Sequence, residues 1–283
     1  MAPVILSFCY VWYRYHTINP VLSLIFLIAA MSLHFFVNAF DNYNDFHNAN
    51  EEGHDYKQKT NVIGKQKITN KNALTVIITL FSIFTLLGLY LLINTGWPLL
   101  IMGGICAVIG YFYSGGPHPI SHGPLGELLS GLTMGFMILL IGVYINIHDM
   151  FKWNFSTLGA IFLIALPSVC WIANVMLANN ICDLEEDKIN DRHTIVFYIG
   201  KQHSINLFVI LNVIAFISVI LSAILGIAPL AYLLTLLVVP FASKQIKLFK
   251  QKQIKTETFS CAVRILGIGS TTEVLSFLIG ILL

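Results

Sequence analysis

Charged residues are scarce in this chain. Only 11% of its 283 residues are Asp, Glu, Lys or Arg, and 57% are hydrophobic. Soluble domains carry about 25% charged residues, so this composition, with a mean hydropathy of +0.78, excludes an ordinary soluble protein. We expect an integral membrane protein in contact with a lipid bilayer.

Cysteine is scarce as well, and the five copies form no CxxC pair. Most of them lie within apolar runs, which argues against a disulfide framework or a zinc site. We expect small core residues at these positions instead.

Apolar stretches take up most of the chain. A transmembrane helix needs roughly 20 apolar residues. The nine stretches therefore predict an all-α integral membrane protein with nine transmembrane helices around a central cavity, in a single membrane domain over residues 1–283. The first stretch is short for a full crossing. The stretches are 1–13, 20–40, 73–93, 97–113, 128–147, 153–182, 204–225, 228–243 and 265–283.

Polar loops separate these stretches, at about 41–72, 114–127, 183–203 and 244–263. Lys and Arg concentrate in cytoplasmic loops of membrane proteins and thereby set the orientation. The segments that follow the second, sixth and eighth stretches hold 13 of the 16 basic residues. This bias predicts that those segments lie on the cytoplasmic side, and the alternation of nine spans places the loop 114–127 on the same side.

Two of these loops begin with the same pattern of Asn and Asp residues, at spacing i, i+3, i+7. At about 100° per residue, this spacing places the three side chains on one face of a helix. Two carboxylate faces are therefore predicted at one membrane surface. The first motif is Asn38, Asp41 and Asp45, after the second stretch, and the second motif is Asn180, Asp183 and Asp187, after the sixth.

The two motifs favour a divalent metal ion and a polyanion. Carboxylates at close quarters cannot all stay ionised without cations, and Asp and Asn oxygens suit Mg²⁺, which bridges carboxylates to substrate phosphates. We predict that all six motif residues are Mg²⁺ ligands and that the four Asp residues are catalytic. The candidates for diphosphate binding are Asn38, Lys57, Lys59, Lys65, Asn180, Lys188 and Arg192. An acidic loop beside basic residues is also what an ordinary solvated membrane flank looks like.

Three further polar residues are candidates for lining the acceptor side of the cavity. Tyr113 begins a Gly- and Pro-rich segment, Glu127 opens an apolar helix where an ionisable group is costly, and Asn174 lies inside the sixth stretch. Each has an ordinary alternative: an interfacial aromatic belt for Tyr113, a favourable helix dipole for Glu127 and interhelical packing for Asn174. Glu273, inside the last stretch, is expected to pair with a neighbouring polar group.

These features resemble the UbiA superfamily of membrane aromatic prenyltransferases. The resemblance rests on the paired NxxDxxxD motifs, the apolar stretches and the basic cytoplasmic loops, and it covers nearly the whole chain. Relatives often read NxxND at the first motif, whereas here Asp41 precedes Asn42. Three regions are most similar to the branch that prenylates 1,4-dihydroxy-2-naphthoate in menaquinone synthesis: LANNICDLEEDKINDRHT (177–194), YSGGPHPISHGPLGE (113–127), and NAFDNYNDF (38–46) with TNVIGK (60–65).

The resemblance implies the UbiA-type fold, with Mg²⁺ as a cofactor linking a polyprenyl diphosphate to both motifs. In the implied reaction the allylic C–O bond of the diphosphate ionises, and an electron-rich aromatic acceptor attacks the cation in a water-poor cavity. Loss of the acceptor's carboxylate then gives demethylmenaquinone. The resemblance also implies a multi-pass protein of the bacterial cytoplasmic membrane, with its active site facing the cytoplasm and no nucleic-acid partner. It leaves the isoprenoid length and the oligomeric state open.

The residues leave two other functions open. A prenyltransferase with another aromatic acceptor, such as 4-hydroxybenzoate, keeps the same motifs. A membrane transporter also carries an internal repeat with charged residues in its helices. Carriers, however, generally bind ions near the bilayer midplane, and both motifs here are predicted at helix ends.

Overall fold

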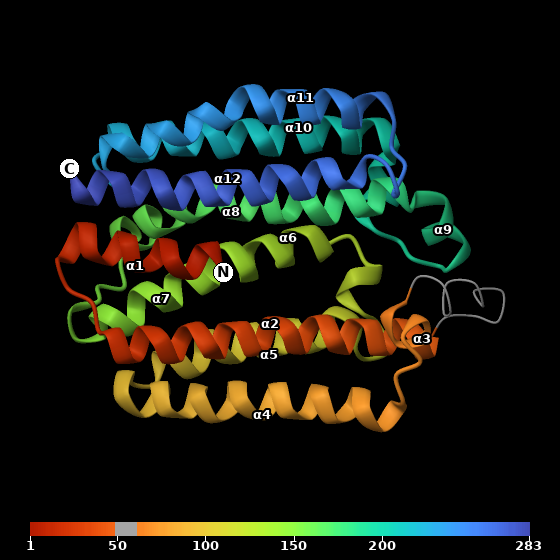
Figure 1. Cartoon of the computed structure of the whole chain (residues 1–283), viewed down its shortest axis with the longest axis horizontal. Helices are drawn as coiled ribbons and strands as arrows, with labels where there is room; N and C mark the ends of the chain where they lie inside the picture. Colours follow the sequence, from red (N-terminus) through yellow and green to blue (C-terminus); the bar gives the residue numbers. More distant parts are fainter. Residues whose placement is uncertain (49–60) are drawn as a thin grey trace. The chain divides into compact units, whose positions relative to one another are not determined.

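The structure, a computed structural model, describes residues 1–48 and 61–283, and every regular element in those residues is a helix (Figure 1). The α-helices are α1 (Ala2–Tyr15), α2 (Pro20–Asn48), α3 (Val62–Lys65), α4 (Asn70–Thr95), α5 (Pro98–Ser114), α6 (Gly126–Gly131), α7 (Ile138–Ile147), α8 (Phe155–Cys182), α9 (Leu184–Ile189), α10 (Ile195–Ile224), α11 (Val239–Gln251) and α12 (Phe259–Leu282). The 3₁₀ helices are η3 (Ile120–His122), η5 (His148–Met150) and η6 (Leu230–Val238), and η4 (Leu132–Met137) is a π-helix.

The chain divides into two compact units. The first unit comprises residues 1–23 and 122–283, and the second comprises residues 24–121. The boundary at 23–24 falls inside α2. The expected organisation as a single membrane domain stays a prediction.

Helix α8 is the centre of the first unit, where it packs against α6, η4, α10 and α12. Asn154 caps its start by accepting a hydrogen bond from the Thr157 backbone N–H at 2.8 Å. The helix is apolar on all sides and carries the fully buried Trp171. Such a helix needs partners on every face, and α8, α10, α11 and α12 accordingly lie side by side (Figure 1).

A buried polar network connects α12 to η6 and α8. The Tyr232 hydroxyl donates to Glu273 Oε1 at 2.7 Å, and the Ser168 hydroxyl donates to Glu273 Oε2 at 3.3 Å. Glu273 is fully buried. The predicted pairing of Glu273 with neighbouring polar groups is therefore confirmed.

The second unit is built from α2, α3, α4 and α5. Helices α4 and α5 form a tight hairpin, and the positive φ of Gly96 (91°), a conformation that favours glycine, makes the turn between them possible. Phe36 of α2 contacts Phe81 of α4, with 5.0 Å between ring centroids, and Phe40 stacks on Tyr111 of α5 at 5.2 Å. Aromatic side chains thus pack α2 against both arms of the hairpin.

The number of membrane-spanning helices differs from the nine that we expected. In the described residues, seven helical segments are long and apolar enough to cross a membrane. Helix α1 has 14 residues and α5 has 17, which is short of the roughly 20 needed. A count of nine is therefore not confirmed. The seven are Pro20–His47, Asn70–Thr95, Gly126–Met150, Phe155–Cys182, Ile195–Ile224, Leu230–Gln251 and Phe259–Leu282.

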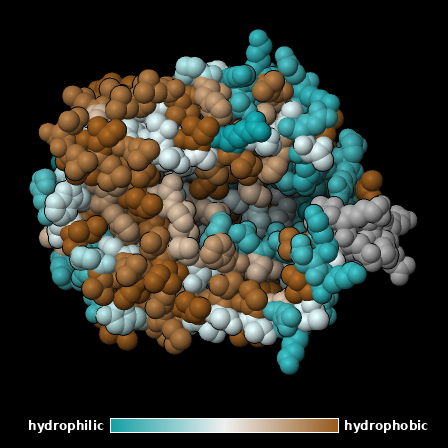
Figure 2. Space-filling view, in the orientation of Figure 1, coloured by the Kyte–Doolittle hydropathy of each residue, from teal (hydrophilic) through white to brown (hydrophobic). Residues whose placement is uncertain are grey.

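Polar residues of the first unit gather at one end of its helices. Figure 2 shows hydrophilic side chains where α9 and the α11–α12 connection lie, whereas hydrophobic side chains cover much of the remaining visible face of α11 and α12. The segments expected to be loops there are partly helical, because 183–203 contains α9 and the start of α10, and 244–263 contains the end of α11 and the start of α12. In the second unit, α2 continues past residue 41 to Asn48.

Candidate functional site

The second motif lies where α8 gives way to α9. Asn180 is on the last turn of α8, Asp183 lies between the two helices, and Asp187 is on α9. The predicted uninterrupted helix therefore breaks at Asp183. The Asp183 N–H closes the end of α8 by donating to Asn179 O at 3.0 Å, and the Asp183 carbonyl accepts the first hydrogen bond of α9 from the Asp187 N–H at 2.8 Å. Asp183 is therefore the junction of the two helices.

Asp187 is a buried carboxylate with an unpartnered oxygen. Asp187 is 4% exposed, and its Oδ2 atom has no hydrogen-bond partner among residues 1–48 and 61–283. Burial raises the pKa of this carboxyl from 3.8 to about 6, and the positive charge of Arg192 partly opposes the rise. A buried carboxylate with a free lone pair is costly unless a cation binds it, so this oxygen is suited to a metal ion.

Lys255 is a residue of the site that the sequence reasoning missed. It lies on the connection between α11 and α12 and forms an ion pair with Asp183, whose side chain is 12% exposed. Its charge also lowers the pKa of Asp187. By sequence, Lys255 is only one of the basic residues that set the membrane orientation. The only sequence feature that could have pointed to the site was the position of Lys255 in a basic loop, which was predicted on the same membrane side as the second motif.

Glu127 contacts the second motif directly. The Asn180 side-chain amide donates to Glu127 Oε1 at 2.8 Å, and Glu127 is only 7% exposed at the start of α6. The second carboxylate oxygen, Oε2, is buried and has no hydrogen-bond partner in the part of the chain that the structure describes. The structure thus groups Glu127 with the second motif, whereas the sequence suggested only an acceptor or cavity role.

The basic residues predicted beside the second motif differ in their surroundings. Lys188 lies on the exposed side of α9 and pairs with Glu185 at 2.9 Å. Arg192 is half-buried, and its backbone N–H donates to the Asp187 carbonyl at 2.8 Å, across a turn in which Asp191 has φ 54°. The turn therefore holds Arg192 close to the motif. Roles for both residues in diphosphate binding stay predictions.

The first motif lies on the last turns of α2, in the second unit. Asn38 Nδ2 is 3.2 Å from His34 Nε2, and Asp41 and Asp45 are half-buried and engaged in contacts. Asn61, which caps α3, donates to the Asn42 carbonyl at 2.9 Å and so ties α3 to the motif.

The lysines predicted beside the first motif are placed only in part. Lys65 is exposed at the end of α3. The predicted diphosphate residues Lys57 and Lys59 lie outside the described residues.

Tyr113 and Asn174 lie in different units. Tyr113 is half-buried near the end of α5, next to Ser114, whose backbone carbonyl accepts a hydrogen bond from Asn44 Nδ2 at 3.2 Å. Asn174 is buried in the first unit and donates to the Phe208 carbonyl of α10 at 3.0 Å. This contact is the packing hydrogen bond that we considered as the alternative for Asn174. The acceptor roles of both residues stay predictions.

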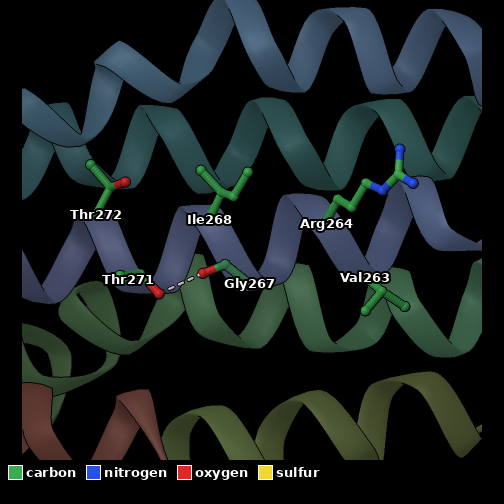
Figure 3. A pocket seen from close by; sticks show the side chains of 6 residues that line it. All are labelled: Val263, Arg264, Gly267, Ile268, Thr271 and Thr272. Carbon is green, nitrogen blue, oxygen red and sulfur yellow. Dashed lines mark hydrogen bonds between the residues drawn. The ribbon is translucent and has the colours of Figure 1, made fainter.

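A separate groove of about 550 Å³ runs along α12 (Figure 3). All of its lining comes from that one helix, and the Thr271 hydroxyl is already bonded to the Gly267 carbonyl at 2.8 Å. No polar groups from other elements converge on it. We therefore do not regard it as a candidate active site. Its lining residues are Val263, Arg264, Gly267, Ile268, Thr271 and Thr272.

The donor set of the second motif fits Mg²⁺. Asn180, Asp183 and Asp187 offer amide and carboxylate oxygens, which are the ligands that this ion prefers, and the buried Oδ2 of Asp187 is an acceptor without a hydrogen-bond partner among the described residues. Within residues 1–48 and 61–283, no group of three or more His, Cys, Asp and Glu side chains is arranged to hold a metal ion by itself. The six-residue ligand set predicted from the sequence stays a prediction.

Comparisons with known proteins agree with this description. The UbiA prenyltransferase family matches residues 1–265. The 1,4-dihydroxy-2-naphthoate octaprenyltransferase of Bacillus subtilis (strain 168) is 30% identical over 243 residues, covering 85% of this chain and 75% of the relative. A UbiA homologue from Aeropyrum pernix K1 has a similar structure, with TM-score 0.72 at 18% identity and 97% of both chains covered. A UbiA homologue from Archaeoglobus fulgidus bound to GPP and Mg²⁺ has TM-score 0.64 at 12% identity, covering 100% of this chain and 96% of that one.

Proposed function

The chain belongs to the UbiA prenyltransferase family, and on that premise we propose that it transfers a polyprenyl group from polyprenyl diphosphate to 1,4-dihydroxy-2-naphthoate. The chain is a multi-pass integral membrane protein of all-helical UbiA fold. The proposal adds the acceptor, the loss of its carboxylate as CO₂ and a site that faces the cytoplasm of a bacterial cell. The direct product is demethylmenaquinol, the quinol form of demethylmenaquinone.

The buried carboxylate of Asp187 is the observation that carries the site assignment. Its orphaned oxygen lies on the motif that also holds Asn180 and Asp183. We propose that these three residues hold Mg²⁺ together with the diphosphate. The metal ion, when bound, supplies Lewis-acid contacts to the diphosphate oxygens and so favours their departure with the electron pair of the C–O bond.

The protein's own residues supply positive charge and a dry environment around the same motif. Lys255 contributes an ammonium group next to Asp183, and Arg192 contributes a guanidinium group near Asp187. Both groups stabilise the negative charge that accumulates on a departing diphosphate. The buried apolar residues Ile181 and Leu184, which alternate with the motif residues along the chain, limit the access of water, which would otherwise capture an allylic cation.

The first motif is proposed to take part in binding the same diphosphate. Its spacing repeats that of the second motif, and its carboxylates Asp41 and Asp45 are half-buried at the end of α2. The homologue from Archaeoglobus fulgidus was solved with GPP and Mg²⁺, so prenyl diphosphate and this metal ion occur together in the family. Mutational coupling between the two motifs tests this part of the proposal.

The acceptor assignment is supported by similarity to the Bacillus subtilis relative and by the three sequence regions that resemble naphthoate enzymes. Prenylation of this acceptor differs chemically from the main alternative. A new bond forms between the allylic carbon and the ring, the diphosphate leaves, and the ring regains aromaticity as its carboxylate departs as CO₂. Prenylation of 4-hydroxybenzoate retains the carboxylate.

This difference provides the test. Purified protein in lipid nanodiscs, with Mg²⁺ and a series of polyprenyl diphosphates, is supplied with carboxyl-labelled dihydroxynaphthoate. We expect labelled CO₂ in a one-to-one ratio with the prenylated quinol, and none from the Asp187→Asn variant. Turnover only with 4-hydroxybenzoate, or label retained in a prenylated acid, would refute the acceptor but leave the prenyltransferase assignment intact. Membership of a prenyltransferase family argues against the transporter alternative.

A further inference from the structure

The hydrogen bond between Asn180 and Glu127 orients the Asn180 amide. The donor in this bond is the amide nitrogen Nδ2, and the acceptor is Glu127 Oε1, 2.8 Å away. A carboxylate offers only acceptors, so the amide must direct its NH₂ group toward Glu127. The carbonyl oxygen Oδ1, which is the only atom of the amide that can bind a cation, then points away from Glu127.

Burial makes this contact more than a surface hydrogen bond. Glu127 is 7% exposed, and its second oxygen has no hydrogen-bond partner. Burying an acidic side chain costs free energy. Asn180 is the side chain that donates a hydrogen bond to Glu127. Oxygen Oε2 of Glu127 and Oδ2 of Asp187 are both buried, and neither has a hydrogen-bond partner among the described residues.

Close helix packing fixes the position of Glu127 relative to α8. A Cβ atom added to Gly131 would lie 2.7 Å from the Val169 carbonyl oxygen, and one added to Gly135 would lie 2.6 Å from the Val169 backbone nitrogen. Only glycine at these positions lets α6 and η4 approach α8 so closely. Glu127 is one turn before Gly131. The contact of Gly131 with Val169 therefore fixes the position along α8 at which the Glu127 carboxylate meets Asn180.

We infer that Glu127 is a positioning residue that presents Asn180 Oδ1 to the metal–diphosphate unit, with Gly131 and Gly135 as the packing contact that holds it in place. The inference rests on the proposed function, because it assigns a role toward the same diphosphate site. Outer partners of this kind orient metal ligands, and their loss commonly weakens metal affinity by about 10–100-fold. Glu127 itself does not need to touch the metal or the substrate.

Mn²⁺ binding measured by electron paramagnetic resonance tests the inference without turnover. Full-length protein in detergent is titrated with Mn²⁺ in the presence of inorganic pyrophosphate. We expect Glu127→Leu to raise the Mn²⁺ dissociation constant by about 10–100-fold. Glu127→Gln should rescue most of the affinity, because its side-chain carbonyl still accepts from Asn180. Equal affinities for Glu127→Leu and wild type, no rescue by Glu127→Gln, or no Mn²⁺ binding by wild type would each overturn the inference.

A matched pair of glycine variants tests the packing contact. Gly131→Ala should weaken Mn²⁺ binding about tenfold or more, because the new methyl group forces α6 away from Val169 although neither partner of the hydrogen bond has changed. Gly159→Ala serves as the control, because a methyl group added at this exposed position of α8 would meet no atom within 4 Å. This control should leave Mn²⁺ affinity intact. The same affinity loss in both variants, or in neither, would contradict the role of the packing contact.

The dependence of turnover on Mg²⁺ separates positioning from general support of the fold. A positioning role predicts that Glu127→Leu raises the KM for Mg²⁺ by about 10–100-fold, with kcat at saturating Mg²⁺ largely recovered. A merely structural role lowers kcat through a smaller active fraction and leaves the KM for Mg²⁺ unchanged, and that result would overturn the inference. Mn²⁺ binding does not involve the acceptor, so failure of the naphthoate assignment leaves this test readable.

Discussion

Lys255, on the connection between α11 and α12, forms an ion pair with Asp183 at the end of α8. The two residues are 72 positions apart in the sequence. Helix packing therefore brings a second basic loop to the second motif, in addition to the loop that contains the motif itself. A half-exposed ammonium group that already neutralises a motif carboxylate is well placed to help bind a polyanion at the same site.

Lys255→Met tests this role in diphosphate binding. Because a charge-assisted hydrogen bond contributes about 1.5–3 kcal/mol, we expect the KM for prenyl diphosphate to rise by roughly tenfold or more. Lys247→Met, which removes the same charge from an exposed position of α11, is the control and should change this KM by less than about twofold. Steady-state kinetics at fixed acceptor concentration measure both. A similar KM in the two variants would mean that Lys255 only stabilises the folded loop.

The two motifs should act as a unit if they bind one diphosphate. We expect Asp45→Asn and Asp183→Asn each to reduce kcat/KM by several orders of magnitude, and the double variant to lose little more than either single variant. Such non-additivity is typical of residues that serve one catalytic step. Rapid-quench measurement of prenyl transfer at a range of Mg²⁺ concentrations gives the coupling energy. Losses that simply add would indicate two independent sites.

The buried Glu273 network should stabilise the first unit without taking part in catalysis. Tyr232→Phe removes the donor to Glu273 Oε1 and leaves a fully buried carboxylate oxygen with one partner fewer. We expect a loss of about 1–3 kcal/mol in the free energy of unfolding, measured by denaturation in detergent. The KM values for both substrates should stay near those of wild type. Unchanged stability would show that water or another donor replaces the hydroxyl.

The sequence supported prediction of the helical membrane fold and of the motif spacing, because both depend on local patterns. Long apolar runs specify membrane helices, and the second motif follows the apolar run of α8 at the junction with α9, where the local sequence changes from apolar to acidic. The count of nine spans was not confirmed because two of the nine apolar stretches form helices shorter than the roughly 20 residues of a crossing. These are α1, with 14 residues, and α5, with 17.

The tertiary partners of the motif could not be predicted from local patterns. Glu127 and Asn180 are 53 positions apart, and their contact depends on how closely Gly131 lets α6 approach α8. Lys255 looked like any other lysine of a basic loop, since nothing in its neighbours along the chain indicates Asp183 as its partner. Such contacts are encoded by packing between distant segments, which a single sequence does not reveal.

We expect the Asp187 carboxylate to be required for turnover and, at the same time, to lower the stability of the metal-free folded protein. Burial raises its pKa from 3.8 to about 6 in the folded, metal-free protein. A raised folded-state pKa means that the protonated form is favoured by folding. The stability that the protonated Asp187 carboxyl gives the folded state is fully present below about pH 4. It is lost as the pH rises through about 6, because the folded protein must then keep a charged carboxylate buried. The metal-free protein is therefore destabilised at neutral pH by up to about 3 kcal/mol, at roughly 1.4 kcal/mol per pKa unit.

Asp187→Asn should therefore abolish turnover and yet make the metal-free protein more stable at pH 7.5, because a neutral amide replaces the buried charge. Unfolding in detergent with EDTA should show a gain of up to about 3 kcal/mol at pH 7.5 that shrinks toward pH 4. Glu186→Gln, the same change at an exposed neighbour, should show little of this effect. Adding Mg²⁺ with pyrophosphate should stabilise wild type and not Asp187→Asn, since only the carboxylate gains from the bound cation. A variant that is less stable than wild type at pH 7.5 in EDTA would contradict the burial of an uncompensated charge at this position.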